Sequence, residues 1–326
     1  MPPREKFLVT GAMGCLGAWV LRHLRNEGAA VVAADLSSDP VRPRLLMSDE
    51  ELQAIDWLIL DITDAAAVNR TVSDHEITHI VHLAGLQIPF CKANPALGAA
   101  VNVVGTINVL EAVRHNGVSG LAYASSLAAL GPPQLYERVP VEDDAPTAPS
   151  TLYGVYKVTN EETARLYWTD WRVGSIGLRP YNVFGVGRDQ GLTADVAKAI
   201  LAVAAGEPFH IRYGGPLALQ HASDVAEMFI AAARLAHQGA AVVNVRNDVT
   251  TVEAFVDLLS ELYPHAQITN ERGNLLPFPA DLDDAGLRRL IGDVPHVPLT
   301  EAIRQDVEQY RSLLKTGRLD LEQLSL

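Results

Sequence analysis

A tyrosine and a lysine four positions apart, Tyr153 and Lys157, stand in the stretch "STLYGVYKVTNEE". On a helix this spacing places both side chains on one face. A phenol is a weak base at neutral pH because its unperturbed pKa is about 10. A neighbouring ammonium group and a nearby helix N-terminus both favour the phenolate. The pair therefore predicts a group that takes a proton from an alcohol, or returns it to a carbonyl.

Two serines precede this pair in "YASSLAALG", at the end of an apolar run. A hydroxyl at the carboxyl edge of a parallel sheet would orient the reacting oxygen and form a hydrogen bond with the tyrosine. The residues alone do not decide between Ser125 and Ser126, since one of the two can simply cap the strand. Tyr156 lies next to the lysine but projects elsewhere, and we interpret it as a packing residue.

Three glycines, Gly11, Gly14 and Gly17, occupy the turn "VTGAMGCLGAW" between an apolar run and a helical pattern. Backbone amides at such a helix start face a pyrophosphate, and the missing β-carbons allow it to come close. A glycine turn alone is weak evidence for that function. Asp35 ends the next apolar run, where an acid accepts hydrogen bonds from an adenosine ribose and repels a 2′-phosphate. The two features together predict NAD as the cofactor.

Six short apolar runs alternate with helical patterns over the first half of the chain. The expected strands are 6–11, 29–35, 56–62, 78–85, 120–126 and 174–180, and the expected helices are 15–28, 63–75, 93–117 and 153–171. Strands that are apolar on both faces require helices on both sides of a parallel sheet. We predict an α/β, doubly wound (Rossmann) sheet over residues 1–180. Residues 181–326 would mainly form a smaller substrate-binding lobe, with a helix near 221–236 packing back on the sheet.

The glycine spacing, the serine run and the tyrosine–lysine pair resemble the extended short-chain dehydrogenase/reductases, the NAD-dependent epimerase/dehydratase family. "HLAGLQ" resembles the cofactor-facing strand of its UDP-galactose 4-epimerase-like members, with Gln87 where those carry lysine. "LRPYNVFGVG" resembles the segment over the nicotinamide, and "HASDVAEMFIAA" resembles a later family helix. Aligning the family's serine motif on Gly131 places the catalytic serine at Ser126. The resemblance thus implies Ser126, Tyr153 and Lys157 as catalytic residues.

The same resemblance implies a set of cofactor-binding residues along the carboxyl edge of the sheet. They are Gly11, Met13, Gly14, Cys15, Leu16, Gly17, Asp35, Leu36, Asp61, Ile62, Leu83, Ala84, Gly85, Asn102, Tyr153, Lys157 and Pro180.

One departure concerns the substrate. Nucleotide-sugar enzymes of this family carry an arginine four residues before the histidine matched by His221, and here that residue is Leu217. Further polar candidates for holding a substrate are Gln220, His221, Arg272, Arg212 and Arg188. A diphosphate with one cation fewer binds less well, since a charge-assisted hydrogen bond contributes about 1.5–3 kcal/mol. A free sugar, a sugar acid or a polyol is therefore a candidate beside a nucleotide sugar.

Two other kinds of chemistry find no support. The residues that follow Ser126 are Leu127, Ala128 and Ala129, so the acidic pair of the family's dehydratases is missing. His79 and His82 point to opposite faces of a strand, which argues against a metal site with His75.

The composition limits the partners. The 326 residues carry a formal net charge of -13, which disfavours nucleic acid and anionic membranes, and two cysteines predict no disulfide framework. The N-terminal stretch does not have the apolar core of a signal peptide, and we expect no apolar run able to span a bilayer. These features predict a cytoplasmic protein. The resemblance implies a homodimer through the helices at 96–112 and 153–168.

Three functions remain open. The first is epimerisation of a sugar or nucleotide sugar by hydride transfer to and from NAD. The second is net oxidation or reduction of a free sugar, a sugar acid or a polyol. The third is a non-catalytic NAD-binding protein, which the intact set of Ser126, Tyr153 and Lys157 disfavours.

Overall fold

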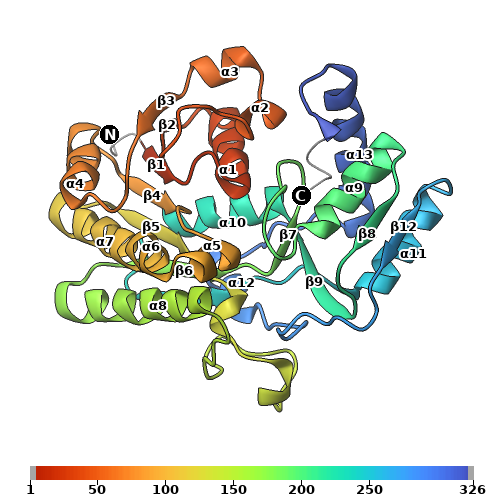
Figure 1. The fold of residues 1–326 in the computed structure, drawn as a ribbon. Helices are drawn as coiled ribbons and strands as arrows, with labels where there is room; N and C mark the ends of the chain where they lie inside the picture. The colour runs from red at the N-terminus through yellow and green to blue at the C-terminus, as the bar shows by residue number, and fades with distance from the viewer. Residues whose placement is uncertain (1–4, 322–326) are drawn as a thin grey trace.

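Seven parallel strands form the main sheet of the computed structural model, which describes residues 5–321 (Figure 1). The expectation about a signal peptide lies partly outside these residues, at 1–4. The spatial order is β3–β2–β1–β4–β5–β6–β10. The strands are β1 (Lys6–Thr10), β2 (Ala30–Asp35), β3 (Asp56–Ile59), β4 (His79–His82), β5 (Gly120–Ala124), β6 (Ser175–Arg179) and β10 (Ala240–Asn244).

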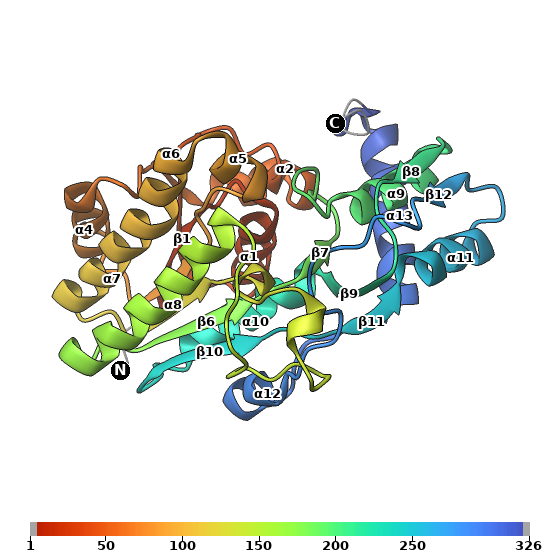
Figure 2. The same cartoon turned by 60° about the horizontal axis from the view of Figure 1, so that its bottom comes forward.

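Helices cover both faces of this sheet, which is why its central strands are buried and apolar. On one face α1 (Cys15–Asn26) packs against α10 (Ala222–Arg234), and α10 also contacts β4 and β5. On the other face α7 (Gly105–Asn116) packs against both α4 (Ala65–Asp74) and α8 (Leu152–Trp171) (Figure 2). The predicted doubly wound parallel sheet is confirmed. Its strand order reverses between β1 and β4, and in such folds ligands bind at the carboxyl edge beside that point.

The long helix expected over 93–117 is interrupted. It consists of α6 (Pro95–Ala99), a π-helical turn η1 (Ala100–Val104) and α7. By length and composition residues 95–116 could cross a membrane, so the expectation that no run is apolar enough was wrong for this segment. Half of its apolar window is buried inside the protein, where α7 packs on α4 and α8. This packing accounts for the apolar character of the segment.

Short helices join the strands where the sequence pattern indicated none. They are α2 (Pro43–Leu46), α3 (Asp49–Gln53), α5 (Ile88–Ala93), η2 (Leu127–Ala129), η3 (Pro133–Leu135) and α12 (Ala285–Ile291). Each of them has seven residues or fewer, and a hydrophobic period of 3.6 residues does not show over so few positions.

A second lobe holds two small sheets, β7–β9–β11 and β8–β12. Its strands are β7 (Asn182–Phe184), β8 (Phe209–Ile211), β9 (Pro216–His221), β11 (Asp248–Thr251) and β12 (Ile268–Asn270), and its helices are α9 (Asp195–Ala205), α11 (Val252–Leu262) and α13 (Leu299–Lys315). Between β9 and β11 the chain returns to the first lobe to form α10 and β10. Residues beyond 180 therefore build part of the main sheet as well as the second lobe.

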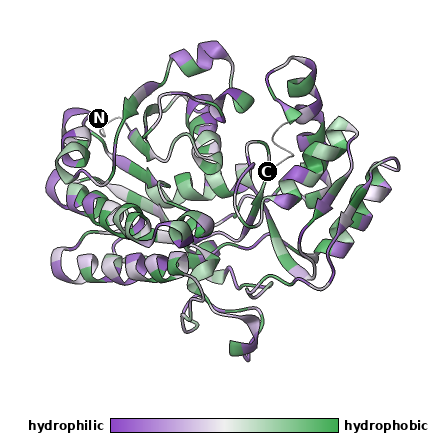
Figure 3. Ribbon diagram, in the orientation of Figure 1, coloured by the Kyte–Doolittle hydropathy of each residue, from purple (hydrophilic) through white to green (hydrophobic). Residues whose placement is uncertain are grey.

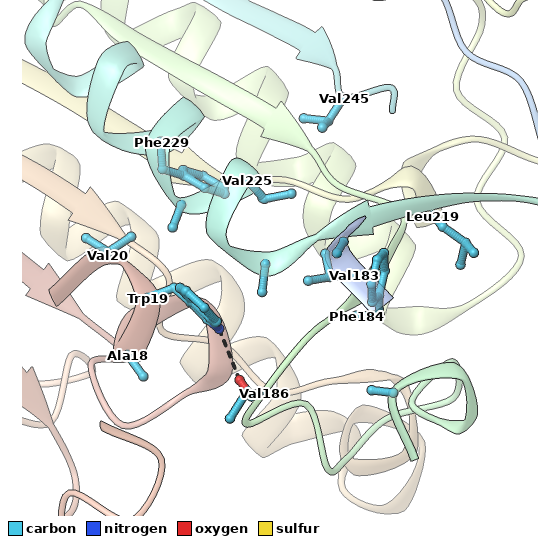
Figure 4. Close-up of a cluster of buried hydrophobic side chains, with 14 of the residues drawn as sticks. Ala18, Trp19, Val20, Val183, Phe184, Val186, Leu219, Val225, Phe229 and Val245 are labelled. Atoms are coloured by element: carbon cyan, nitrogen blue, oxygen red, sulfur yellow. Dashed lines mark hydrogen bonds between the residues drawn. The ribbon is translucent and has the colours of Figure 1, made fainter. Parts of the chain in front are cut away.

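One apolar core runs between the lobes. Hydrophobic residues gather on the strands and the inner helix faces (Figure 3), and Trp19 of α1 belongs to the same buried cluster as Phe184, Val186 and Phe229 (Figure 4). The Trp19 indole Nε1 donates a hydrogen bond to Val186 O at 3.0 Å. Val186 lies just before residues 188–193, which line the cavity at the carboxyl edge of the sheet, so this core helps to fix the position of that segment.

Candidate active site

The three glycines of the turn after β1 differ in how closely the rest of the protein packs against them. Gly11 has φ +72°, and a β-carbon there would lie 2.6 Å from Ala84 N. A β-carbon on Gly17 would collide with Gly11 O. The fold alone requires these two glycines. A β-carbon on Gly14, the N-cap of α1, would meet only Gly11 O at 3.1 Å, and Gly14 faces the cavity. The free space above Gly14 fits a phosphate at the helix start.

Asp35 connects the end of β2 to this turn. Its Oδ2 accepts a hydrogen bond from Met13 N at 2.9 Å, and its Oδ1 accepts one from Leu36 N at 2.7 Å. The carboxylate therefore lies beside the glycine turn at the cavity wall, where a ribose would sit in this fold. The residues present fit a dinucleotide without a 2′-phosphate.

Tyr153 and Lys157 lie in the first two turns of α8, and Thr151 caps that helix by accepting from Gly154 N at 3.0 Å. The Lys157 Nζ lies 5.3 Å from the centroid of the Tyr153 ring. It also donates a hydrogen bond to Ala124 O, the last residue of β5, at 2.6 Å. This contact holds the ammonium group under the tyrosine at the carboxyl edge of the sheet.

Burial opposes charge on both groups. It lowers the pKa of Lys157 to about 8. It raises the pKa of Tyr153, while a hydrogen bond with Ser126 and the charge of Arg188 act in the opposite direction. Burial therefore favours the protonated tyrosine, and added positive charge beside it is needed to favour its phenolate.

The two serines have different neighbours. Ser126 lies next to Tyr153 and acts to lower the pKa of its hydroxyl, and the Ser126 Oγ accepts a hydrogen bond from Ala128 N at 3.1 Å. The Ser125 hydroxyl instead donates to the buried carboxylate of Glu161, which also accepts two hydrogen bonds from Arg179, at 2.8 and 2.7 Å. Ser126 is therefore the serine that contacts the tyrosine, while Ser125 belongs to a buried ionic network.

One cavity of about 610 Å³ joins these parts at the carboxyl edge of the sheet. It is lined by Ser126 and by every residue of the expected cofactor set except Asn102. Asn102 is fully buried in the π-helical turn, and its Nδ2 donates to Gly98 O at 2.9 Å and to Leu86 O at 3.2 Å. Through the hydrogen bond to Leu86 O, Asn102 therefore supports the loop after β4 without lining the cavity itself.

Of the three candidate arginines, only Arg188 lines this cavity. Arg212 donates to the buried Asp195 at 2.9 and 2.6 Å, and Arg272 is exposed outside the cavity wall. Leu217, at the position where the resemblance implied an arginine in nucleotide-sugar enzymes, is completely buried in β9.

The other polar candidates and the histidines have structural partners. Gln220 Nε2 donates to Val245 O at 2.6 Å, and His221 Nε2 lies 3.2 Å from Asp306 Oδ1. His82 lies between two threonine hydroxyls, and burial lowers its pKa to about 3. Within residues 5–321, no group of three or more His, Cys, Asp or Glu side chains has the arrangement of a metal site.

Sequence reasoning missed an ionic contact above the glycine turn. Arg42 donates to Asp189 Oδ1 from Nε at 3.0 Å and from Nη2 at 2.8 Å, and its Nη1 donates to Met13 O at 3.0 Å. Both side chains line the cavity. The two residues are 147 positions apart in the sequence, so no local sequence pattern predicts this contact.

Comparison with known proteins assigns the family. The model of the NAD-dependent epimerase/dehydratase family matches residues 7–245. The chain belongs to this family. UDP-glucose 4-epimerase of Mus musculus is 31% identical over 219 residues, which cover 62% of each chain, so this protein matches about three fifths of that relative. UDP-glucose 4-epimerase of Mycolicibacterium smegmatis is 29% identical over 319 residues, which cover 94% of this chain and 98% of the relative.

A solved structure has the same fold. UDP-glucose 4-epimerase of Thermus thermophilus, in complex with NAD, superposes with a TM-score of 0.79 at 23% identity and covers 94% of this chain and 99% of its own. The expected family and fold are thereby confirmed. This degree of identity does not determine the substrate.

The contact between Arg42 and Asp189 should slow the loss of cofactor. Arg42 bridges the glycine turn and the segment of Asp189, and replacing it with methionine removes one hydrogen bond to Met13 O and two to Asp189 Oδ1. Charge-assisted hydrogen bonds contribute about 1.5–3 kcal/mol each, so we expect NAD to dissociate roughly tenfold faster or more. The rate is measured by following the nucleotide after rapid dilution. Arg44→Met breaks an exposed ion pair with Asp39 and is the matched control; equal rates in both variants would contradict the prediction.

Proposed function

We propose that this protein is an NAD-dependent epimerase or oxidoreductase that acts on a secondary alcohol or ketone of a sugar or nucleotide sugar. One observation carries the proposal: Ser126, Tyr153 and Lys157 converge at the wall of a cavity that also contains the glycine turn and Asp35. The family membership supports an enzyme, and a relative of the same fold holds NAD.

The cofactor set would hold NAD along the carboxyl edge, with the diphosphate over Gly14 and the adenosine ribose at Asp35. When bound, NAD supplies a hydride acceptor and a positive charge at its nicotinamide end.

The chain's own residues handle the proton. Ser126 orients the reacting oxygen, and the Tyr153 oxygen takes the hydroxyl proton as the carbon loses its hydride. The Lys157 ammonium stabilises the Tyr153 phenolate that takes this proton, because it lies against the tyrosine ring and is fixed by Ala124 O. In the reverse direction Tyr153 returns the proton to the oxygen of the carbonyl.

The names of the relatives favour epimerisation of a nucleotide sugar. A specific observation supports the second candidate, a dehydrogenase or reductase of a sugar without a nucleotide. The cavity wall contains neither Arg212 nor Arg272, and Leu217 fills the place of the family arginine. The pyrophosphate of a nucleotide sugar would therefore lack these cations.

We also propose that residues 1–180 form the NAD-binding domain and that residues 181–326 mainly form the substrate-binding lobe. We further propose a cytoplasmic location and a homodimer. Exposed apolar side chains on the helices at 95–116 and 152–171 support the dimer, since a surface of this kind is typical of a subunit interface. They are Leu97, Val104, Val155, Leu166 and Trp171.

The test incubates the enzyme with UDP-galactose, with galactose and with galacturonate, each with added NAD. An epimerase converts its substrate to the other stereoisomer, seen by proton NMR, without NADH accumulating in solution. A dehydrogenase accumulates NADH in proportion to product. Absence of both changes for every sugar tested, together with unchanged behaviour of Tyr153→Phe, would leave only the non-catalytic alternative.

A further inference from the structure

The part of the cavity beyond the catalytic residues contains a cation without a counter-charge. Arg188 lies at the cavity wall, and its buried Nε has no hydrogen-bond partner among residues 5–321. Within the same residues its Nη2 donates to Thr193 Oγ1 alone, at 3.5 Å. No ion pair joins Arg188 to a carboxylate of residues 5–321, because the adjacent Asp189 is bound to Arg42.

A buried guanidinium N–H without an acceptor costs free energy that a ligand can recover. The planar edge of an arginine matches a carboxylate through two parallel hydrogen bonds. Arg188 and Tyr153 line the same cavity, and the charge of Arg188 acts to lower the pKa of Tyr153. An anion bound at Arg188 therefore shares the cavity with the group that takes the proton.

Two neutral groups of the same cavity are also unpartnered. Gln87 Oε1 and the Tyr181 hydroxyl are buried, line the cavity and have no hydrogen-bond partner within residues 5–321. A β-carbon on Gly191, whose φ is +105°, would lie 2.6 Å from Gln87 Oε1 and 3.0 Å from Arg188 Nη2. The glutamine and the arginine therefore converge on one point. An acceptor and a hydroxyl next to a cation suit the hydroxyl groups of an acidic sugar.

We propose that Arg188 binds the carboxylate of a small polyhydroxy acid, a sugar acid without a nucleotide, and that Gln87 and Tyr181 bind its hydroxyl groups. This inference rests on the proposed function, because it needs Tyr153 to act on a hydroxyl of the bound acid. In the oxidation, a C–H bond and the O–H bond of one CHOH group break and a C=O bond forms. The hydride with its electron pair goes to NAD, and the proton goes to Tyr153.

A carboxylate matches the site better than a phosphate monoester. A phosphate group carries about -1.5 to -2 charges at neutral pH. Of the cations that line the cavity, Arg42 is paired with Asp189 and Lys157 is held at Ala124 O beside the Tyr153 ring, which leaves Arg188 as the cation available to an anion. One guanidinium balances one carboxylate.

The experiment measures binding apart from turnover. Galacturonate, galactose, galactose 1-phosphate and UDP-galactose are titrated calorimetrically into NAD-loaded Tyr153→Phe protein, with and without Arg188→Leu. We expect galacturonate to bind at least tenfold more tightly than galactose, and Arg188→Leu to remove that preference while NAD still binds. Arg188→Lys should restore only part of it, because a lysine lacks the planar fork. Arg272→Leu, an exposed arginine outside the cavity, is the matched control and should change nothing.

The outcomes separate the two proposals. Galacturonate binding that depends on Arg188 in a protein that turns over no sugar would support the carboxylate site at Arg188 and contradict the proposed function. Turnover of UDP-galactose with a KM that Arg188→Leu leaves unchanged would support the proposed function and overturn the carboxylate site at Arg188. Tighter binding of galactose 1-phosphate than of galacturonate would overturn the assignment of a carboxylate.

Discussion

Tyr153→Phe should lower kcat by about 10²- to 10⁴-fold, the usual contribution of a positioned proton-transfer group. The phenyl ring keeps the packing of Tyr153 against Lys157, but it has no oxygen to take the proton of the substrate. The affinity for NAD should stay within about twofold of the wild type, since the nucleotide is held along the whole carboxyl edge. Steady-state turnover of the identified substrate and a titration with NAD measure the two quantities.

Tyr156→Phe is the matched control for this result. Tyr156 lies one turn along the same helix, and its hydroxyl donates to Pro95 O at 2.9 Å, away from the catalytic lysine. This variant should keep its activity. If Tyr153→Phe turned over as fast as Tyr156→Phe, the assignment of the proton-transfer group would be wrong.

Glu161→Gln should destabilise the protein by about 3–5 kcal/mol, which is the cost of breaking a buried ion pair on one side. The side chains of Glu161 and Arg179 are 6% and 4% exposed, and the glutamate accepts hydrogen bonds from Ser125 and from two nitrogens of the arginine. A glutamine removes the carboxylate that is paired with the buried arginine through two hydrogen bonds. The loss is a large part of the 5–15 kcal/mol that stabilises a typical domain, and urea unfolding measures it.

The neighbouring residue provides the control for that measurement. Glu162 pairs with Arg165 on the exposed side of α8, with side chains 60% and 59% exposed. Glu162→Gln should change the free energy of unfolding by no more than about 1 kcal/mol, as for other surface ion pairs. Equal destabilisation by the two variants would show that the buried network does not hold Ser125 and β6 in place.

The periodic parts of the fold could be predicted from the sequence. The six expected strands and the helices α1, α4 and α8 appear within a few residues of their predicted bounds, because they are long runs with a clear period. The seventh strand, β10, was missed. It follows a region with irregular spacing, and only its pairing with β6 shows that it belongs to the main sheet.

Some features of the candidate site could also be predicted from the sequence, and others could not. Tyr153, Lys157 and the glycine turn are local patterns, so the sequence alone indicates them. The different roles of Ser125 and Ser126 depend on Glu161, which lies 36 positions away from Ser125. The contact of Arg42 with Asp189 and the missing partner of Arg188 depend on three-dimensional neighbours in the same way. The spacing of residues along the sequence does not show which distant residues come into contact.

The most direct test of a nicotinamide enzyme built on Tyr153 and the glycine turn is the nucleotide content of the purified protein. The protein is denatured, and NAD and NADH in the supernatant are quantified against the protein concentration. We predict that the protein carries NAD, or binds added NAD but not NADP, because Asp35 repels a 2′-phosphate. Near-stoichiometric nucleotide that survives gel filtration favours an epimerase, and reversible exchange favours a dehydrogenase. A protein that neither contains nor binds NAD would contradict the account.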